Sequence, residues 1–326
     1  MEGKGFNMQN LKLSKEQSNT IKGIAVLMLL VHHYSGLEFA LDALSICKSL
    51  GPIICSSFFF VSGYGLAVNR HSFQTRYWTK RFLSVLIPFW LSNTIYIGYE
   101  LFMGNISVNA TRLITDFLGI TLINGHCWFL QVLLLLYFSI AFLSARQILN
   151  NDTATSCTCT LIGGGKILVY CMITGLLYTI ITQKVYSLSW VAFPIGFYIA
   201  NHPVNVSKKL ISVGILLLGG SFAYYYIGHN LINTPVRLLN FVFLSVTAIP
   251  FIYLISFLRI PVKAIGQQSM NYYMMHGLCL RILTQMDFEH KYVYVLLYIV
   301  MVVIVANIFG RITKHLVMTI CQHLNV

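Results

Sequence analysis

The chain has 326 residues, of which 57% are hydrophobic and only 10% are charged. Charged residues make up roughly a quarter of a soluble domain, so this composition excludes an ordinary soluble globular protein and indicates a polytopic membrane protein. The formal net charge of +13 does not indicate nucleic-acid binding, because the basic residues lie in short segments between apolar runs, as the positive-inside rule expects.

Apolar stretches long enough to cross a bilayer, on the order of 20 residues each, follow one another along the chain. The first comes after a polar, basic N-terminus, residues 1–20, and lacks a signal-peptide cleavage site, so we expect a retained helix. The predicted spans, about ten in all, are 21–37, 50–68, 82–103, 128–145, 166–183, 187–200, 210–228, 237–257, 265–285 and 292–310. The sequence therefore predicts an all-α transmembrane helix bundle, formed by a single integral-membrane domain over residues 1–326 with no appended soluble domain.

The basic residues predict the orientation of these spans. If the spans alternate across the membrane from a cytoplasmic N-terminus, most of the 22 Lys and Arg residues fall on the cytoplasmic side. Several of them, including Arg76, Lys80 and Arg81, precede the third span. Because positive charge is enriched in cytoplasmic loops, we expect both termini to be cytoplasmic.

The eight cysteines lie mostly within or beside apolar runs, where a small, weakly polar side chain packs well. Only Cys157 and Cys159 form a close pair, and a single C-x-C pair is weak evidence for a metal site. The sequence therefore predicts no bound metal.

The first predicted span begins at Lys22 and contains two adjacent histidines, His32 and His33, deep in its apolar run. Helical geometry places Lys22 and His33 on one face, about 16 Å apart along the axis, and turns His32 away by about 100°. Ionisable groups inside a membrane usually face a polar cavity or a reaction path. The alternative is that Lys22 is an ordinary positive-inside anchor and His33 a packed, hydrogen-bonded histidine.

Other ionisable residues lie in or near later spans. His126 precedes the fourth span, and His276 and Arg281 lie inside the ninth. Buried charges need partners, and the candidates are Asp287, Glu289 and the groups of the first helix.

Five stretches carry a resemblance through their order and spacing. They are KGIAVLMLLVHH in the first span, SSFFFVSGYGL in the second, KRFLSVLIPFW in the third, HCWFL before the fourth and SMNYYMMHG in the ninth. Together they resemble the membrane-bound acyltransferase-3 family, ten-helix enzymes similar to bacterial O-acetyltransferases of cell-surface sugars.

The resemblance implies an O-acyltransferase, in a bacterial inner membrane, that moves an acyl group from cytoplasmic acetyl-CoA or another acyl-CoA to a hydroxyl of a cell-envelope or lipid-linked sugar. It selects His33, and not His32, as the catalytic base. A nearby carboxylate, Glu38 or Glu100, would orient the ring of His33. The residues it implies for the donor phosphates are Lys22, Arg81 and Lys80, and those it implies for substrate binding or support are Glu38, Ser62, His126, Trp128, Tyr273 and His276.

The sequence departs from the family pattern at two positions. Lys22 stands where the family has an arginine, which keeps the charge but loses the planar guanidinium that grips phosphate with two hydrogen bonds. Ser84 stands at the second position of a two-arginine element that here retains only Arg81. We expect donor binding that is weaker, that recruits Lys80, or that differs in kind.

Two other classes of protein remain open on the residues alone. A transporter or flippase for an anionic or glycan substrate also places cations and histidines inside a bundle, but it moves its substrate without chemical change. A purely structural membrane protein would tolerate replacement of His33. Within the enzyme class, direct attack on the donor and an acyl-histidine intermediate are both open.

Overall fold

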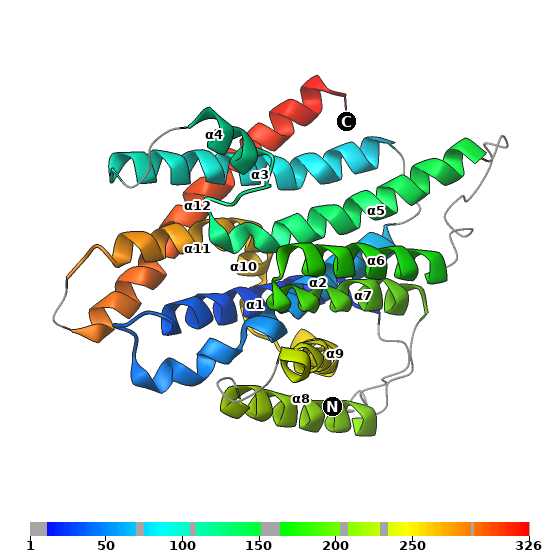
Figure 1. The fold of residues 1–326 in the computed structure, drawn as a ribbon, viewed down its shortest axis with the longest axis horizontal. Helices are drawn as coiled ribbons and strands as arrows, with labels where there is room; N and C mark the ends of the chain where they lie inside the picture. The colour runs from blue at the N-terminus through cyan, green and yellow to red at the C-terminus, as the bar shows by residue number, and fades with distance from the viewer. Residues whose placement is uncertain are drawn as a thin grey trace, which may run out of the picture. The chain divides into compact units, whose positions relative to one another are not determined.

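The structure is a computed structural model that describes residues 12–69, 75–104, 109–150, 164–202, 208–228, 234–287 and 290–325. Cys157, Cys159 and Glu289 lie outside these residues. Every regular element within them is a helix, which confirms the predicted all-α class (Figure 1). The elements are α1 (Lys15–Ser35), η1 (Asp42–Ser49), α2 (Gly51–Val68), α3 (Thr75–Phe102), α4 (Ala110–Phe117), η3 (Gly125–Cys127), α5 (Trp128–Asn150), α6 (Gly164–Thr182), η5 (Val185–Val191), α7 (Ala192–Asn201), α8 (Lys208–Gly228), α9 (Thr234–Ser256), α10 (Lys263–Gln267), α11 (Ser269–Leu283) and α12 (Lys291–His323), where η marks a 3₁₀ helix.

Six helical segments in the described ranges are long and apolar enough to cross a membrane. They are Gly51–Val68, Thr75–Phe102, Gly125–Ala145, Gly165–Thr182, Leu239–Ser256 and Lys291–His323. Each coincides with one of the spans predicted from the sequence. Several apolar helices of this length identify a multi-pass membrane protein.

The other four predicted spans also coincide with helices, but these helices are not both long enough and apolar enough to be counted with the six. The stretch 21–37 is the apolar part of α1, 187–200 covers η5 and α7, 210–228 lies on α8, and 265–285 covers α10 and α11. α7 has only 10 residues and α11 only 15, whereas a helix needs about 20 to cross a bilayer alone. The count of ten spans and the cytoplasmic position of both termini therefore stay predictions.

The chain forms two compact units. The first comprises the described residues of Met1–Met28, Ser49–His71 and Leu136–Gln267, and the second those of Leu29–Lys48, Ser72–Leu135 and Gln268–Val326. The boundary between the units falls within α1 and within α5.

In the first unit, α2 packs against α7, α9 and η5, and α8 packs against α9. The approach of α2 to α7 depends on Gly63, because a Cβ atom there would collide with the backbone carbonyl of Phe193. At the start of α1, Lys263 donates a hydrogen bond of 2.7 Å to Glu16, and this cation lowers the pKa of the Glu16 carboxyl.

In the second unit, α11 packs along α12 and both helices contact α3. Aromatic stacking fixes the end of α1 and the turn that follows it on α12. The ring of Tyr34 stacks on Tyr298 with centroids 5.8 Å apart, and that of Phe39 stacks on Tyr294 at 4.1 Å. These contacts fix the turn of α1 that carries His33.

Candidate functional site

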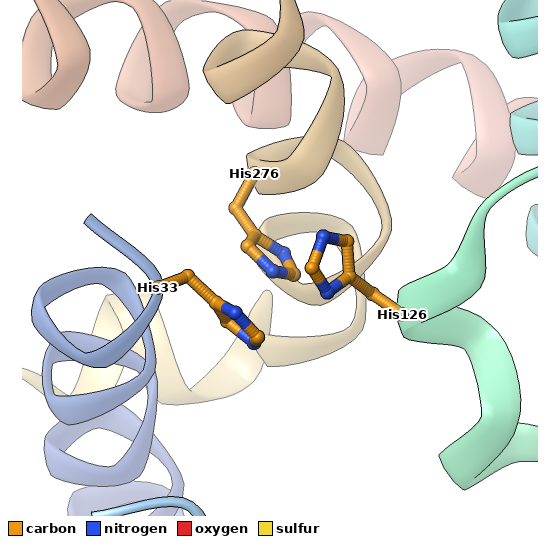
Figure 2. Close-up of side chains that lie close together, drawn as sticks. All are labelled: His33, His126 and His276. Carbon is orange, nitrogen blue, oxygen red and sulfur yellow. The ribbon is translucent and has the colours of Figure 1, made fainter. Parts of the chain in front are cut away.

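Three histidines from distant parts of the sequence meet within the second unit. His33 comes from the last turn of α1, His126 from η3 and His276 from α11, and their rings converge on one space (Figure 2). The ring centroids lie 4.3 Å apart for His33 and His126, 4.8 Å for His33 and His276, and 4.7 Å for His126 and His276. We call these three residues the histidine cluster.

His276 is the most deeply buried member of the histidine cluster, with an exposed fraction of 0%. Its Nδ1 lies 2.7 Å from the backbone carbonyl of Tyr273. Because a carbonyl oxygen can only accept a hydrogen bond, Nδ1 carries the proton and Nε2 holds a lone pair. Nε2 is buried and has no hydrogen-bond partner among the described residues. A buried acceptor without a partner lowers the stability of the folded protein unless a ligand or substrate binds to it.

The backbone around His126 is fastened to α11. Asn124 accepts a hydrogen bond from the His126 amide at 3.2 Å and donates one to the carbonyl of Met274 at 3.1 Å. The hydroxyl of Tyr273 donates to the carbonyl of His126. Tyr273 therefore holds two members of the histidine cluster, His276 through its carbonyl and His126 through its hydroxyl.

His32 makes a different contact from its neighbour. Its Nδ1 lies 3.0 Å from the carbonyl of Cys47, within η1. The centroids of the His32 and His33 rings are 4.8 Å apart. His32 therefore links α1 to the segment that follows it, and His33 is the histidine of α1 that belongs to the cluster.

An ion pair lies beside the cluster. Arg281 pairs with Glu100, donates to the carbonyl of Ile123 at 2.8 Å, and has its guanidinium carbon 5.1 Å from the centroid of the Tyr96 ring. Asp287, one of the candidate partners named from the sequence, is exposed. Arg281 thus connects α11 to α3 and to the segment that leads into η3.

The structure places the other predicted site residues as follows. Tyr273 is buried, and Trp128 is half-buried at the first position of α5. Glu38 is exposed in the turn after α1, and Glu100, the alternative carboxylate for His33, pairs with Arg281. On α3, Arg81 is half-buried and Lys80 is exposed, while Ser84 is exposed and donates to the carbonyl of Arg81 at 2.7 Å. Lys22 and Ser62 are half-buried and belong to the first unit.

Three residues of this site carried no signal in the sequence. They are Tyr96, Asn124 and Gly277, each of a type that is common in apolar helices or loops. Gly277 lies where the ring of His126 and the hydroxyl of Tyr96 approach α11 closely. A Cβ atom at Gly277 would come within 2.8 Å of the Tyr96 hydroxyl and 2.9 Å of His126 Nε2.

We expect Gly277→Ala to displace the His126 ring and to destabilise the protein by about 1–3 kcal/mol, as overpacking of a buried site does. The measurement is the midpoint of thermal unfolding of the purified protein in detergent. Gly98→Ala is the matched control, because Gly98 lies inside α3 with no described atom within 4 Å of its Cβ position. Alanine is the better helix former, so this control should be neutral or slightly stabilising. Equal midpoints for the two variants would contradict the close approach at Gly277.

One comparison with known proteins identifies a family. Residues 16–311 match the acyltransferase-3 family model, which describes an acyltransferase domain. No curated protein and no solved structure matches the chain. Because the match covers most of the chain and the structure contains several helices suited to a membrane, this protein belongs to the acyltransferase-3 family of membrane acyltransferases.

Proposed function

We propose that the protein is an O-acyltransferase of a bacterial plasma membrane. It takes an acyl group, acetyl in the simplest case, from a cytoplasmic acyl-CoA and transfers it to a hydroxyl of a cell-envelope or lipid-linked sugar. The observation that carries the proposal is the histidine cluster, because acyl transfer to a hydroxyl needs a base near neutral pH and imidazole is the side chain suited to this.

In the proposed reaction, His33 accepts the proton of the acceptor hydroxyl. The hydroxyl oxygen forms a bond to the thioester carbonyl carbon, the bond from that carbon to sulfur breaks, and the proton on His33 passes to the leaving thiolate of CoA. The rings of His126 and His276 both contact the ring of His33 and support it there. His33 is the base of choice because the family resemblance selects its position.

The donor phosphates are assigned to the basic residues at the start of α3. Arg81 is half-buried there and Lys80 is exposed. Tyr96 lies beside the histidine cluster and follows Arg81 on the same helix. The two residues are separated by about 22 Å along the helix axis. A long, flexible donor such as acyl-CoA suits a separation of this kind. The assignments of Lys22 and Ser62 rest on the family resemblance alone, as does the approach of the acceptor past His126 and Trp128.

The test supplies radiolabelled acetyl-CoA to membrane vesicles from cells that express the protein. We expect label to enter the glycan fraction as an ester that mild base releases, with one free CoA thiol formed for each ester. Vesicles from cells without the protein provide the background rate.

Two results would contradict the proposal. One is a glycan or anionic solute that crosses the vesicle membrane in a protein-dependent way with no CoA thiol released, which is the behaviour of a transporter. The other is the use of a different class of acyl donor. In that case the protein consumes no acyl-CoA, whatever its chain length, but does consume the other donor.

A further inference from the structure

We propose that His33, His126 and His276 form a binding site for one zinc ion, to which each contributes one ring nitrogen. One such nitrogen from each residue lies within 4.8 Å of the other two. The three rings point at a common space and come from three separate elements (Figure 2). Three imidazole ligands with an open fourth position is an arrangement that zinc adopts in catalytic sites.

The hydrogen bonding of His276 matches that of a metal ligand. A metal-bound histidine usually donates its other ring N–H to a carbonyl or carboxylate, which fixes the tautomer and the direction of the lone pair. His276 donates Nδ1–H to the carbonyl of Tyr273 at 2.7 Å. The remaining nitrogen, Nε2, is the buried acceptor that has no partner among the described residues. A zinc ion bound there would complete it.

The spacing of the three rings is close to that of a metal site. Zinc binds histidine nitrogen at about 2.0–2.1 Å, so tetrahedral ligands lie about 3.4 Å from one another. The three nitrogens therefore need to close by roughly 1–1.5 Å at most, which small rotations of the side chains supply. Tyr273 and Asn124 hold the backbone at His126 by hydrogen bonds, so we expect the side chains to rotate while η3 stays in place.

The charges around the cluster favour an anionic fourth ligand. Arg281 lies on the same helix as His276, and its charge is matched by Glu100. Three neutral imidazoles leave the ion with its full double charge in largely apolar surroundings, where an unpaired charge is costly. We therefore expect hydroxide or another anionic oxygen at the open position.

A zinc site differs from the prediction made from the sequence, which was that no metal is bound because the cysteines lack the spacing of a metal site. It also has a consequence for the proposed function. A zinc ion takes the lone pair of His33 that the reaction needs for proton transfer, so bound zinc is expected to inhibit acyl transfer. The inhibition rests on the proposed function, whereas zinc binding does not.

The test measures zinc bound to the purified protein, freed of its affinity tag, by equilibrium dialysis against zinc chloride. We expect one zinc ion per chain. Alanine at His33, His126 or His276 is expected to weaken binding by more than about tenfold, since replacing even an outer partner of a zinc ligand costs 10–100-fold. His32→Ala is the matched control, because His32 is the neighbour of His33 and its ring engages Cys47. This control should bind zinc as the parent does.

Two further readouts guard against a variant that fails to fold. Cobalt chloride added to the parent should give the visible absorption of a tetrahedral Co²⁺ site, and the same spectrum should appear with His32→Ala. Zinc should also raise the midpoint of thermal unfolding of the parent, because a ligand that binds only the folded state stabilises it. For His276 a glutamine variant, closer in volume, is compared with the alanine variant.

The site is wrong if the parent binds less than one zinc ion per chain, or if the three variants bind zinc as tightly as the parent. Activity separates this outcome from failure of the proposed function. A protein that binds zinc through the three histidines but never consumes acyl-CoA, even after chelation, keeps the metal site and loses the proposed function. A protein that transfers acyl groups but binds no zinc does the reverse.

Discussion

Replacing His33 with alanine is expected to lower kcat for acyl transfer by about 10²–10⁴-fold, the usual contribution of a general base. The donor KM should change little, because the phosphates of the donor are assigned to the start of α3, far along that helix from the histidine cluster. The measurement is the initial rate of CoA thiol release over a range of acetyl-CoA concentrations, normalised to the amount of folded protein. A fall in kcat without a rise in KM is the pattern of an interaction made in the transition state.

His32→Ala is the matched control for this prediction. It removes a histidine from the same turn of α1 and loses one hydrogen bond to the Cys47 carbonyl, at a cost in stability of about 1 kcal/mol. It should retain most of the parent rate. The assignment of the base is wrong if His33→Ala, folded and inserted, matches the parent while His32→Ala is slow.

The double variant His33→Ala/His276→Ala examines whether the two rings act together. Their centroids lie 4.8 Å apart, and residues that act as one unit give strongly non-additive losses. We expect the double variant to be about as slow as His33→Ala alone. Additive losses would indicate that His276 contributes to the rate by a route that does not pass through His33.

The helices of this protein could be predicted from the sequence because they depend on local hydropathy. An apolar run that must satisfy its own backbone in a membrane has to be helical, and all ten predicted ranges coincide with helices. The range 265–285 departs in detail, since it is divided between α10 and α11 at Gln268. Hydropathy does not mark such a break, because it reports the side chains and not the hydrogen bonding of the backbone.

The convergence of the site could not be predicted by the same reasoning. The family resemblance named His33, His126 and His276 one at a time, but the distances between them depend on how helices far apart in the sequence pack. The ion pair of Arg281 with Glu100 joins α11 to α3 in the same way. The sequence indicated that an intramembrane arginine needs a partner, and the candidates were Asp287, Glu289 and the groups of the first helix; Glu100 was not among them.

Breaking the ion pair of Arg281 with Glu100 is expected to lower the stability of the protein. In Arg281→Met the Glu100 carboxylate and the carbonyl of Ile123 lose the hydrogen bonds that Arg281 donates. Removal of one partner from a buried pair costs 3–5 kcal/mol, but the Arg281 side chain is 38% exposed, against 10% for Glu100, so we expect about 1–3 kcal/mol after screening by solvent. The measurement is the thermal unfolding of the purified protein in detergent.

The matched variants are Glu100→Gln and the double variant Arg281→Met/Glu100→Gln, which complete a double-mutant cycle. Glutamine keeps an acceptor for Arg281 and removes the charge that Arg281→Met leaves behind. The double variant should therefore be more stable than Arg281→Met alone. If it is less stable by the sum of the two single effects, the two side chains are not coupled and the pair contributes nothing as a pair.

Arg281→Lys separates the charge from the geometry of the guanidinium. Lysine keeps the positive charge for Glu100, but an ammonium lacks the planar fork that lets Arg281 reach Glu100 and the Ile123 carbonyl at once. Ile123 lies three residues before His126. Loss of the hydrogen bond to the Ile123 carbonyl therefore loosens the segment that leads to the histidine cluster. We expect Arg281→Lys to retain most of the stability and to lose acyl transfer, measured as CoA thiol release, by about tenfold or more, since a 1 Å misplacement remote from the chemistry can cost 10²-fold. Full activity in Arg281→Lys would show that Arg281 serves the site through its charge alone.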